Sequence, residues 1–267
     1  MLVKPNFIGI GGQKCASTWF SECLRSHPEI FMSSPKELRY FSDNMAKGLD
    51  WYLYHFRSSA QCKLRGEFSS NYIYWPESAR RIKNEFGDVK ILAVVRDPVD
   101  RSLSHVKHLI RDGVLPRMSG EISRYQLEKI IFDNPEVLSN SMYQPGLKAY
   151  VDVFGANSVL VVDQQDCLER GEDVMASVWS FLEVKSDFFI PEVDKLISEG
   201  VNPRYHILES FRIGAFSYFK YRAPWLINWI KKSGLSQTYR KLNKGAELSF
   251  SSEALELLKF ELCYYNL

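Results

Sequence analysis

One lysine in a turn of small residues is the first feature that could do chemistry. The run Gly11-Gly12-Gln13-Lys14-Cys15-Ala16-Ser17-Thr18 follows an apolar strand-like segment, 7–10, and precedes helical spacing over 17–26. A strand–turn–helix unit directs free backbone N–H groups and the positive end of a helix dipole at an incoming anion. Small residues let the backbone approach the anion, and the ammonium group adds a mobile charge. The run therefore has the chemistry of a phosphate site, and a tight turn with a solvated lysine is the alternative.

A second candidate is the segment Arg96 to Ser104, "RDPVDRSLS". Ser104 lies eight residues after Arg96, about two turns into a helix that Asp97-Pro98 opens, so both side chains can face one site. A guanidinium and a hydroxyl together form a pocket of fixed geometry for a phosphate monoester. The alternative is a surface arginine followed by a helix cap at Asp97.

The first turn, around Lys14, does not follow the Walker pattern, because no glycine stands directly before Lys14.

Alternating strands and helices must position these residues. The apolar run 89–98, "VKILAVVRDP", is the strongest strand, 30–34 and 158–163 are further strand candidates, and 64–76 ends a strand and enters a loop. Helical patterns cover 17–26, 47–60, 76–86, 98–111, 144–155 and 173–184, whereas 112–140 is polar and irregular or weakly helical, typical of a lid or insertion. This order predicts an α/β, P-loop-like three-layer fold with a central, mainly parallel sheet flanked by helices. Ligands bind beyond the carboxyl ends of such strands.

The chain of 267 residues is long enough for one large domain, which buries roughly three quarters of its unfolded surface. We expect a single domain over 1–267, with the α/β core at 1–198 and a C-terminal helical subregion, rich in aromatic and basic residues, at 199–267. The sequence stops inside an apparent helix, "SSEALELLKFELCYYNL". We therefore expect that the natural chain could continue past Leu267.

Composition excludes several classes of function. A net charge of +2 argues against nucleic-acid binding by bulk electrostatics, and no apolar run reaches the ~18–20 residues of a membrane span. We expect no signal peptide, because the sequence opens directly on "LVKPNFIGIGG", and the five cysteines are scattered, with no ligand spacing for zinc. We expect reduced thiols, no metal site and a cytoplasmic location.

With these motifs in order, the sequence resembles the sulfotransferases that use 3′-phosphoadenosine 5′-phosphosulfate (PAPS), in particular the carbohydrate and Golgi-type branch and its bacterial relatives. "GGQKCASTW" is similar to the family's 5′-phosphosulfate segment and "RDPVDRSLS" to its 3′-phosphate segment. Between them, "SPKELRYF" (34–41) resembles the family's KE-x-x-(Y/F)F segment and "GEFSSNY" (66–72) its GE-x-S-P-x-Y segment. The resemblance covers about residues 5–185.

The resemblance implies a metal-free transfer of the sulfuryl group from PAPS, with PAP as product. It implies that Lys14 stabilises the leaving group and that Glu37 accepts the acceptor's proton, for which the pKa of Glu37 would have to be raised by burial. The implied donor-binding residues are Gly12, Gln13, Lys14, Cys15, Ala16, Ser17, Thr18, Trp19, Arg96 and Ser104, with Asn202, Arg204 and Tyr205 closing over the nucleotide. The implied acceptor is a hydroxyl or amine of a saccharide, lipid or small metabolite, in a bacterial cytoplasm.

Departures from the family pattern keep alternatives open. Cys15-Ala16 replaces the usual Gly-Gly or Ser-Gly, and Ser69 stands where some relatives carry a lysine, which puts a second cation at the sulfate in question. Glu37 is otherwise an exposed neighbour of Arg39, and a histidine, His105 or His108, is an alternative base. A P-loop-type small-molecule kinase and a non-catalytic PAP-binding protein are alternative functions. A homodimer is left open.

Overall fold

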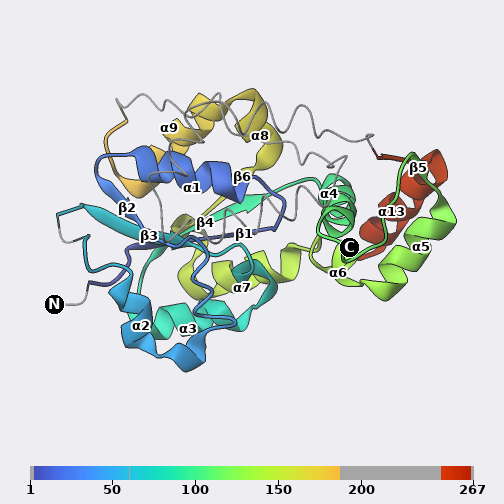
Figure 1. Cartoon of the computed structure of the whole chain (residues 1–267). Coiled ribbons are helices and arrows are strands. Elements are labelled where there is room, and N and C mark those ends of the chain that lie inside the picture. The colour runs from blue at the N-terminus through green and yellow to red at the C-terminus, as the bar shows by residue number, and fades with distance from the viewer. Residues whose placement is uncertain (1–2, 60, 187–247, 266–267) are drawn as a thin grey trace, which may run out of the picture. The chain divides into compact units, whose positions relative to one another are not determined.

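The structure is a computed structural model that describes residues 3–59, 61–186 and 248–265 (Figure 1). Its chain forms two compact units: the first comprises residues 1–102, 135–197 and 260–267, and the second residues 103–134 and 198–259. The expected single domain, with a helical part from residue 199, stays a prediction, because most of that part lies outside the described residues.

The described helices and strands follow the order that the sequence predicts. The first unit holds β1 (Phe7–Gly11), α1 (Ser17–Ser26), β2 (Ile30–Met32), α2 (Leu49–Tyr54), β3 (Leu64–Phe68), α3 (Glu77–Phe86), β4 (Lys90–Val95), the start of α4 (Pro98–Arg111), α6 (Glu136–Ser139), α7 (Gln144–Phe154), β6 (Val159–Asp163), α8 (Gln164–Glu169) and α9 (Gly171–Leu182), with the short 3₁₀ turns η1 (Met45–Lys47), η2 (Tyr72–Tyr74) and η3 (Ala156–Ser158). The second unit holds the rest of α4, β5 (Glu121–Ile122), α5 (Arg124–Asp133), β7 (Ser249–Phe250) and most of α13 (Ser252–Tyr265).

The main sheet has five strands in the order β2-β3-β1-β4-β6, and all its described pairs are parallel. The predicted parallel α/β sheet is therefore confirmed. Gly9 of β1 pairs with Phe68, the last residue of β3, and Gly11 pairs with Val94 near the end of β4. The carboxyl ends of β1, β3 and β4 consequently lie side by side, which is where this fold class binds ligands.

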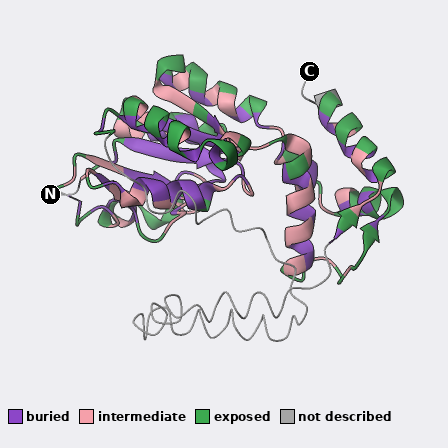
Figure 2. Ribbon diagram, turned by 90° about the horizontal axis from the view of Figure 1, so that it is seen from above, coloured by how far each residue is buried: buried purple, intermediate pink, exposed green. Residues whose placement is uncertain are grey.

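Alternate side chains of the strands bury two separate cores, one on each face of the sheet. Phe7, Leu92 and Val94 pack with residues of α1 and α9, whereas Ile8 and Ile91 pack with residues of α2, α3 and α7. Figure 1 shows α1, α8 and α9 over one face and α2, α3 and α7 over the other, and Figure 2 shows the buried strands between them. This arrangement is the predicted three-layer architecture.

The second unit contains a small parallel pair in which Glu121 of β5 pairs with Ser249 of β7. Its helix α5 begins with a capping box, in which Ser123 and the Gln126 side chain satisfy each other's backbone N–H groups. The segment that we expect to be irregular or weakly helical thus includes a regular ten-residue helix. No helix among the described residues is long and apolar enough to cross a membrane.

Candidate active site

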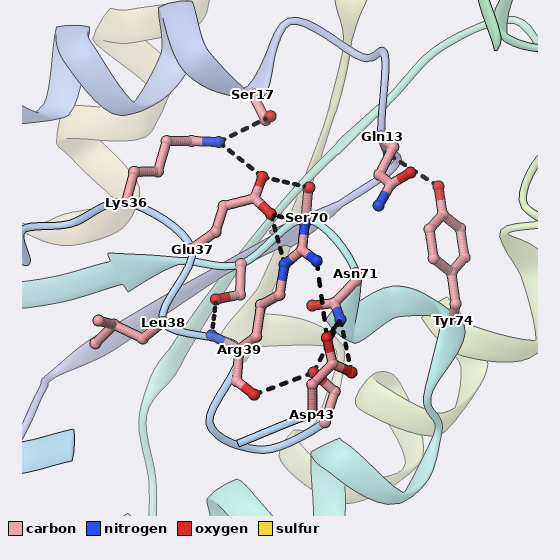
Figure 3. A network of polar contacts seen from close by, with 12 residues as sticks. Gln13, Ser17, Lys36, Glu37, Leu38, Arg39, Asp43, Ser70, Asn71 and Tyr74 are labelled. Carbon is pink, nitrogen blue, oxygen red and sulfur yellow. Dashed lines mark hydrogen bonds and ion pairs between the residues drawn. The ribbon is translucent and has the colours of Figure 1, made fainter. Parts of the chain in front are cut away.

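The turn between β1 and α1 is held by its main chain. The Gly12 N–H donates to the Val94 carbonyl at 2.9 Å, and the Gln13 N–H donates to the Tyr74 hydroxyl at 2.8 Å (Figure 3). Lys14 and Ala16 have φ angles of 72° and 58°, in the left-handed region that non-glycine residues rarely adopt. Such strain persists only where the surroundings enforce it, and it gathers at functional sites. We call residues 12–16 the β1 turn.

The amino end of α1 suits an anion. Its N-cap, Ala16, supplies no side-chain cap, and its first turn carries no acidic residue. The first intrahelical bond runs from the Phe20 N–H to the Ala16 carbonyl at 3.1 Å, so the N–H groups before Phe20 in the first turn have no acceptor within the helix. Because no acidic side chain stands in that turn, the positive end of the helix dipole is not neutralised there. Ser17 is buried and Thr18 exposed. The Trp19 side chain is 1% exposed within the core, so only its main chain can contribute to this site.

Close packing explains the glycine at position 12 and the state of Cys15. A Cβ on Gly12 would lie 2.5 Å from the Cys15 sulfur and 2.7 Å from the Tyr143 ring. The Cys15 sulfur lies 3.3 Å from the Tyr143 hydroxyl oxygen. Burial raises the pKa of the Cys15 thiol to about 11, so the thiol stays neutral at physiological pH. Cys15 therefore adds no negative charge to a turn that we expect to face an anion.

Arg96, which follows β4, points at the β1 turn. Its Nη1 lies 3.5 Å from the Lys14 carbonyl oxygen, at the long limit of a hydrogen bond, and its Nη2 lies 3.8 Å from an Asp100 carboxylate oxygen. The Arg96 Nε is buried and has no hydrogen-bond partner among the residues that the structure describes. A buried donor of this kind is costly unless a ligand or water satisfies it, so Arg96 fits an anion-binding role.

The remaining predicted donor contacts stay predictions. Ser104 lies on α4 in the part that belongs to the second unit, so its pairing with Arg96 rests on sequence spacing. Asn202, Arg204 and Tyr205 lie outside the described residues. The alternative bases His105 and His108 lie further along α4, with ring centroids 6.4 Å apart.

Sequence reasoning missed Arg101, whose side chain hydrogen-bonds to the main chain of the β1 turn. This side chain is fully buried; its Nε donates to the Gln13 carbonyl at 3.3 Å, and its Nη1 donates to the Glu136 and Val137 carbonyls, both at 3.1 Å. The signal lay in the segment "RDPVDRSLS", where Arg101 stands between the two residues that we singled out. Arg101 thus joins the β1 turn to the start of α6.

Glu37 lies at the centre of a charged network from three segments of the chain (Figure 3). Its Oε1 accepts hydrogen bonds from Lys36 Nζ at 3.0 Å and Ser70 Oγ at 2.7 Å. Its Oε2 accepts from Arg39 Nε at 3.1 Å and Nη2 at 2.9 Å. Lys36 Nζ also donates to Ser17 Oγ, at 3.2 Å, in the first turn of α1. The predicted base is thereby connected to the predicted donor site.

The positive charges around Glu37 make its carboxylate a weaker base than an ordinary glutamate. Burial raises the pKa of Glu37, but the Lys36 charge and the hydrogen bonds from Ser70, Lys36 and Arg39 outweigh burial, so the pKa lies below the ordinary value. The direction is opposite to the one that we expected a base to need. The contact with Arg39 exists, yet Glu37 is only 22% exposed, so it is not simply a solvated partner of Arg39.

A second carboxyl group, Glu67, supports this loop from the core. Its oxygens accept from the Tyr72 hydroxyl at 2.6 Å, the Ser69 hydroxyl at 2.7 Å and the Tyr52 hydroxyl at 3.3 Å. Complete burial raises the pKa of Glu67 to about 7. The Ser69 hydroxyl also accepts from the Arg39 N–H at 2.9 Å. Glu67 has no exposure to a substrate, and through Ser69 it holds the segment that carries Glu37.

A parallel α/β sheet with an anion site after its first strand defines a broad class of proteins that bind phosphorylated ligands. Comparison with known proteins narrows that class, although no protein-family model matches the chain. The membrane-associated sulfotransferase kil1 of Dictyostelium discoideum is 34% identical over 157 residues, 58% of this chain and 32% of that protein. The human bifunctional heparan sulfate N-deacetylase/N-sulfotransferase 3 is 32% identical over 204 residues, 67% of this chain and 22% of that protein.

The crystal structure of a sulfotransferase from Alicyclobacillus acidocaldarius matches with a TM-score of 0.63 and 26% identity, over 74% of this chain and 87% of that one. The resemblance drawn from the motifs is confirmed, because these relatives and this solved structure, to which the chain is similar, are sulfotransferases. The chain spans a third or less of the length of these two curated relatives.

Proposed function

We propose that the chain is a PAPS-dependent sulfotransferase that sulfates a hydroxyl or amine of a saccharide, lipid or small metabolite. One observation carries the proposal: the β1 turn meets Arg96 at the Lys14 carbonyl, and Ser17, which directly follows the turn, is joined through Lys36 to Glu37. An anion site and a candidate base thus lie at one edge of the sheet. The sulfotransferase names of the relatives support the same reaction.

In this proposal the donor is bound mainly by main-chain groups. The first-turn amides of α1 bind the 5′-phosphate, and the Lys14 ammonium stabilises the bridging oxygen as it leaves. Arg96 binds the 3′-phosphate together with Ser104. Asn202, Arg204 and Tyr205 close over the nucleotide. The neutral Cys15 thiol keeps the turn free of a repelling charge.

Transfer needs an in-line geometry and a group that takes one proton. The acceptor oxygen or nitrogen forms a bond to sulfur, the bond between sulfur and the bridging oxygen breaks, and PAP leaves with that oxygen's charge. The acceptor's proton passes to Glu37. Because its surroundings keep Glu37 ionised, it is always ready to accept a hydrogen bond, but it is a weak base. It therefore takes the proton late, when the forming bond to sulfur has made the acceptor group acidic.

The nucleotide assignment is tested by calorimetry with two donors. In Arg96→Ala we expect PAPS binding to weaken by about 10- to 100-fold, because a charged hydrogen-bonding partner of the 3′-phosphate is lost. Binding of adenosine 5′-phosphosulfate, which lacks that phosphate, should change little. Equal losses for both would refute the role of Arg96. Arg124→Ala, at an exposed arginine of α5, is the control.

Two further measurements separate the alternative functions. Transfer that survives EDTA supports the metal-free reaction, whereas loss of transfer with EDTA supports the kinase-type alternative. Labelled PAPS incubated with glycan, lipid and metabolite extracts identifies the acceptor class by the fraction that takes up label. PAP binding with no labelled fraction would support a non-catalytic protein. The proposed cytoplasmic location in a bacterium is tested by fractionating the source cells.

A further inference from the structure

Lys36 is a cation that the donor site and the candidate base share. Its Nζ lies 3.2 Å from Ser17 Oγ and 3.0 Å from Glu37 Oε1 (Figure 3). The same atom lies 5.6 Å from the centre of the Phe68 ring. The side chain is only 19% exposed. Ser17, Glu37 and the Phe68 ring therefore fix the position of the Lys36 ammonium group.

The order of these groups follows the axis of the proposed transfer. In-line displacement places the leaving oxygen, the sulfur and the attacking atom roughly on one line. Ser17 belongs to the helix end that binds the leaving phosphate, and Glu37 faces the attacking acceptor. A cation that contacts both Ser17 and Glu37 lies between the two ends of that line, which is the position of the sulfuryl group.

The chemistry of the sulfuryl group suits such a cation. Its oxygens carry negative charge throughout the transfer, and a partly buried ammonium interacts with them more strongly than one in water does. The left-handed backbone at Glu37, with φ of 65°, and at Arg39, with φ of 50°, presents Lys36, Glu37 and Arg39 from one short segment. Backbone strain of this kind is typical of residues that take part in function.

We propose that Lys36 serves both reactants: its ammonium binds the sulfuryl oxygens of the donor and holds the Glu37 carboxylate beside the acceptor. The inference rests on the proposed function and gives a role to Lys36, a residue of the KE segment to which the motif comparison assigned none. Some relatives carry a lysine after β3, where this chain has Ser69. In this proposal the second cation at the sulfuryl group is instead Lys36, on the loop after β2.

The test compares PAPS with PAP and needs no acceptor. PAP has the same two phosphates and no sulfuryl group, so a residue that binds the sulfuryl oxygens affects only PAPS. In Lys36→Met, measured by calorimetry, we expect PAPS affinity to fall about tenfold more than PAP affinity. Lys36→Gln should behave alike, and Lys36→Arg should keep most of the preference for PAPS. Lys47→Met, at the lysine that packs on Trp51, should leave both affinities unchanged.

Each outcome decides something. Equal changes in PAPS and PAP affinity in both neutral variants, with thermal unfolding like that of the wild type, would overturn the role of Lys36 and leave the proposed function standing. A wild-type chain that binds neither nucleotide would overturn the proposed function itself. The contact of Lys36 with Glu37 is tested separately by the pH dependence of the transfer rate. Because the Lys36 charge lowers the pKa of Glu37, the pH at which the rate falls on the acid side should be higher in Lys36→Met. Arg39 and Ser70 still contact Glu37 in this variant and limit the shift. An unchanged pH would overturn this part of the inference.

Discussion

The β1 turn and the segment 33–43 that carries Glu37, here the Glu37 loop, are built in different ways. The β1 turn is fixed through its own main-chain groups: the Gly12 N–H donates to the Val94 carbonyl, and the Gln13 N–H donates to the Tyr74 hydroxyl. The Glu37 loop is fixed in addition through its charged side chain and by side chains far away in the sequence, with Ser70 on the Glu37 carboxylate and Ser69 on the Arg39 N–H. One region offers backbone dipoles, and the other offers charged groups.

This difference separates binding from chemistry. A site made from main-chain amides depends on shape, so Cys15-Ala16 can replace a pair of smaller residues as long as the turn keeps its course. A network of charged side chains depends on each member, because removal of one leaves its partners unpaired. We therefore expect substitutions that alter the course of the β1 turn to change PAP affinity, and substitution of Glu37 to change turnover.

The largest effect is expected for Glu37→Gln. Loss of the proton acceptor should lower the transfer rate by about 10²- to 10⁴-fold, the usual contribution of a general base. PAP affinity should not fall, because the β1 turn is unchanged. The rate is measured by label transfer from PAPS to the acceptor fraction, and PAP binding by calorimetry. Glu22→Gln, at a partly exposed glutamate of α1, is the matched control.

The pH dependence of the wild-type rate decides between bases. The pKa of Glu37 lies below the ordinary value of a glutamate because of the Lys36 charge and the hydrogen bonds from Ser70, Lys36 and Arg39, so its carboxylate is lost only at acid pH, and the rate should stay flat from neutral into mildly acid pH. A histidine base would make the rate fall near pH 6.5. A fall there, together with an active Glu37→Gln variant, would transfer the role to a histidine.

A smaller effect is expected on stability, from the carboxyl group beneath the Glu37 loop. Glu67 has a pKa of about 7 in the folded chain against an ordinary value of 4.5, so the folded state holds this proton over a range in which the unfolded state releases it. The contribution is therefore favourable at low pH and is lost as pH rises through 7. The free energy of unfolding should fall by roughly 3 kcal/mol between pH 4.5 and pH 7 from this group alone.

Chemical denaturation at pH 5 and at pH 8 gives the change in the free energy of unfolding between the two pH values. The difference between this change in the wild type and in Glu67→Gln measures the contribution of Glu67. The amide does not titrate, so the variant should lose less stability between the two pH values. Glu77→Gln, at an exposed position of α3, should follow the wild type. Equal changes for all three proteins would show that Glu67 ionises freely in the folded chain.

The same contrast explains what could be predicted from sequence. β4, "KILAVV", is apolar after its first residue, Lys90, and the β1 turn is one contiguous run, so local composition was enough to place both. The network around Glu37 depends on Ser70 and on the left-handed φ of Glu37, which no local pattern encodes. The pairing of Glu121 with Ser249 joins residues over a hundred positions apart and had no signal of its own.

A fourth prediction concerns the shape of the β1 turn. In Gly12→Ala the new methyl group would meet the Cys15 sulfur and the Tyr143 ring, and such overpacking costs typically 1–3 kcal/mol. PAP affinity should fall about tenfold, as measured by calorimetry. A second substitution, Cys15→Ala, removes one of the two obstacles and should restore part of the loss. Full PAP affinity in Gly12→Ala would mean that the nucleotide does not depend on the course of this turn.

The smallest effect should come from chemical modification of the β1 turn. Cys15 is fully buried and its pKa is about 11, so very little thiolate is present at pH 8, whereas Cys263 is exposed. Iodoacetamide should therefore label Cys263 first, as located by peptide mass spectrometry, and PAP affinity should stay unchanged. Cys263→Ser should remove this fast labelling. Rapid labelling of Cys15 with loss of PAP binding would mean that the turn opens to solvent, and then a site made from a fixed main chain could no longer explain nucleotide binding.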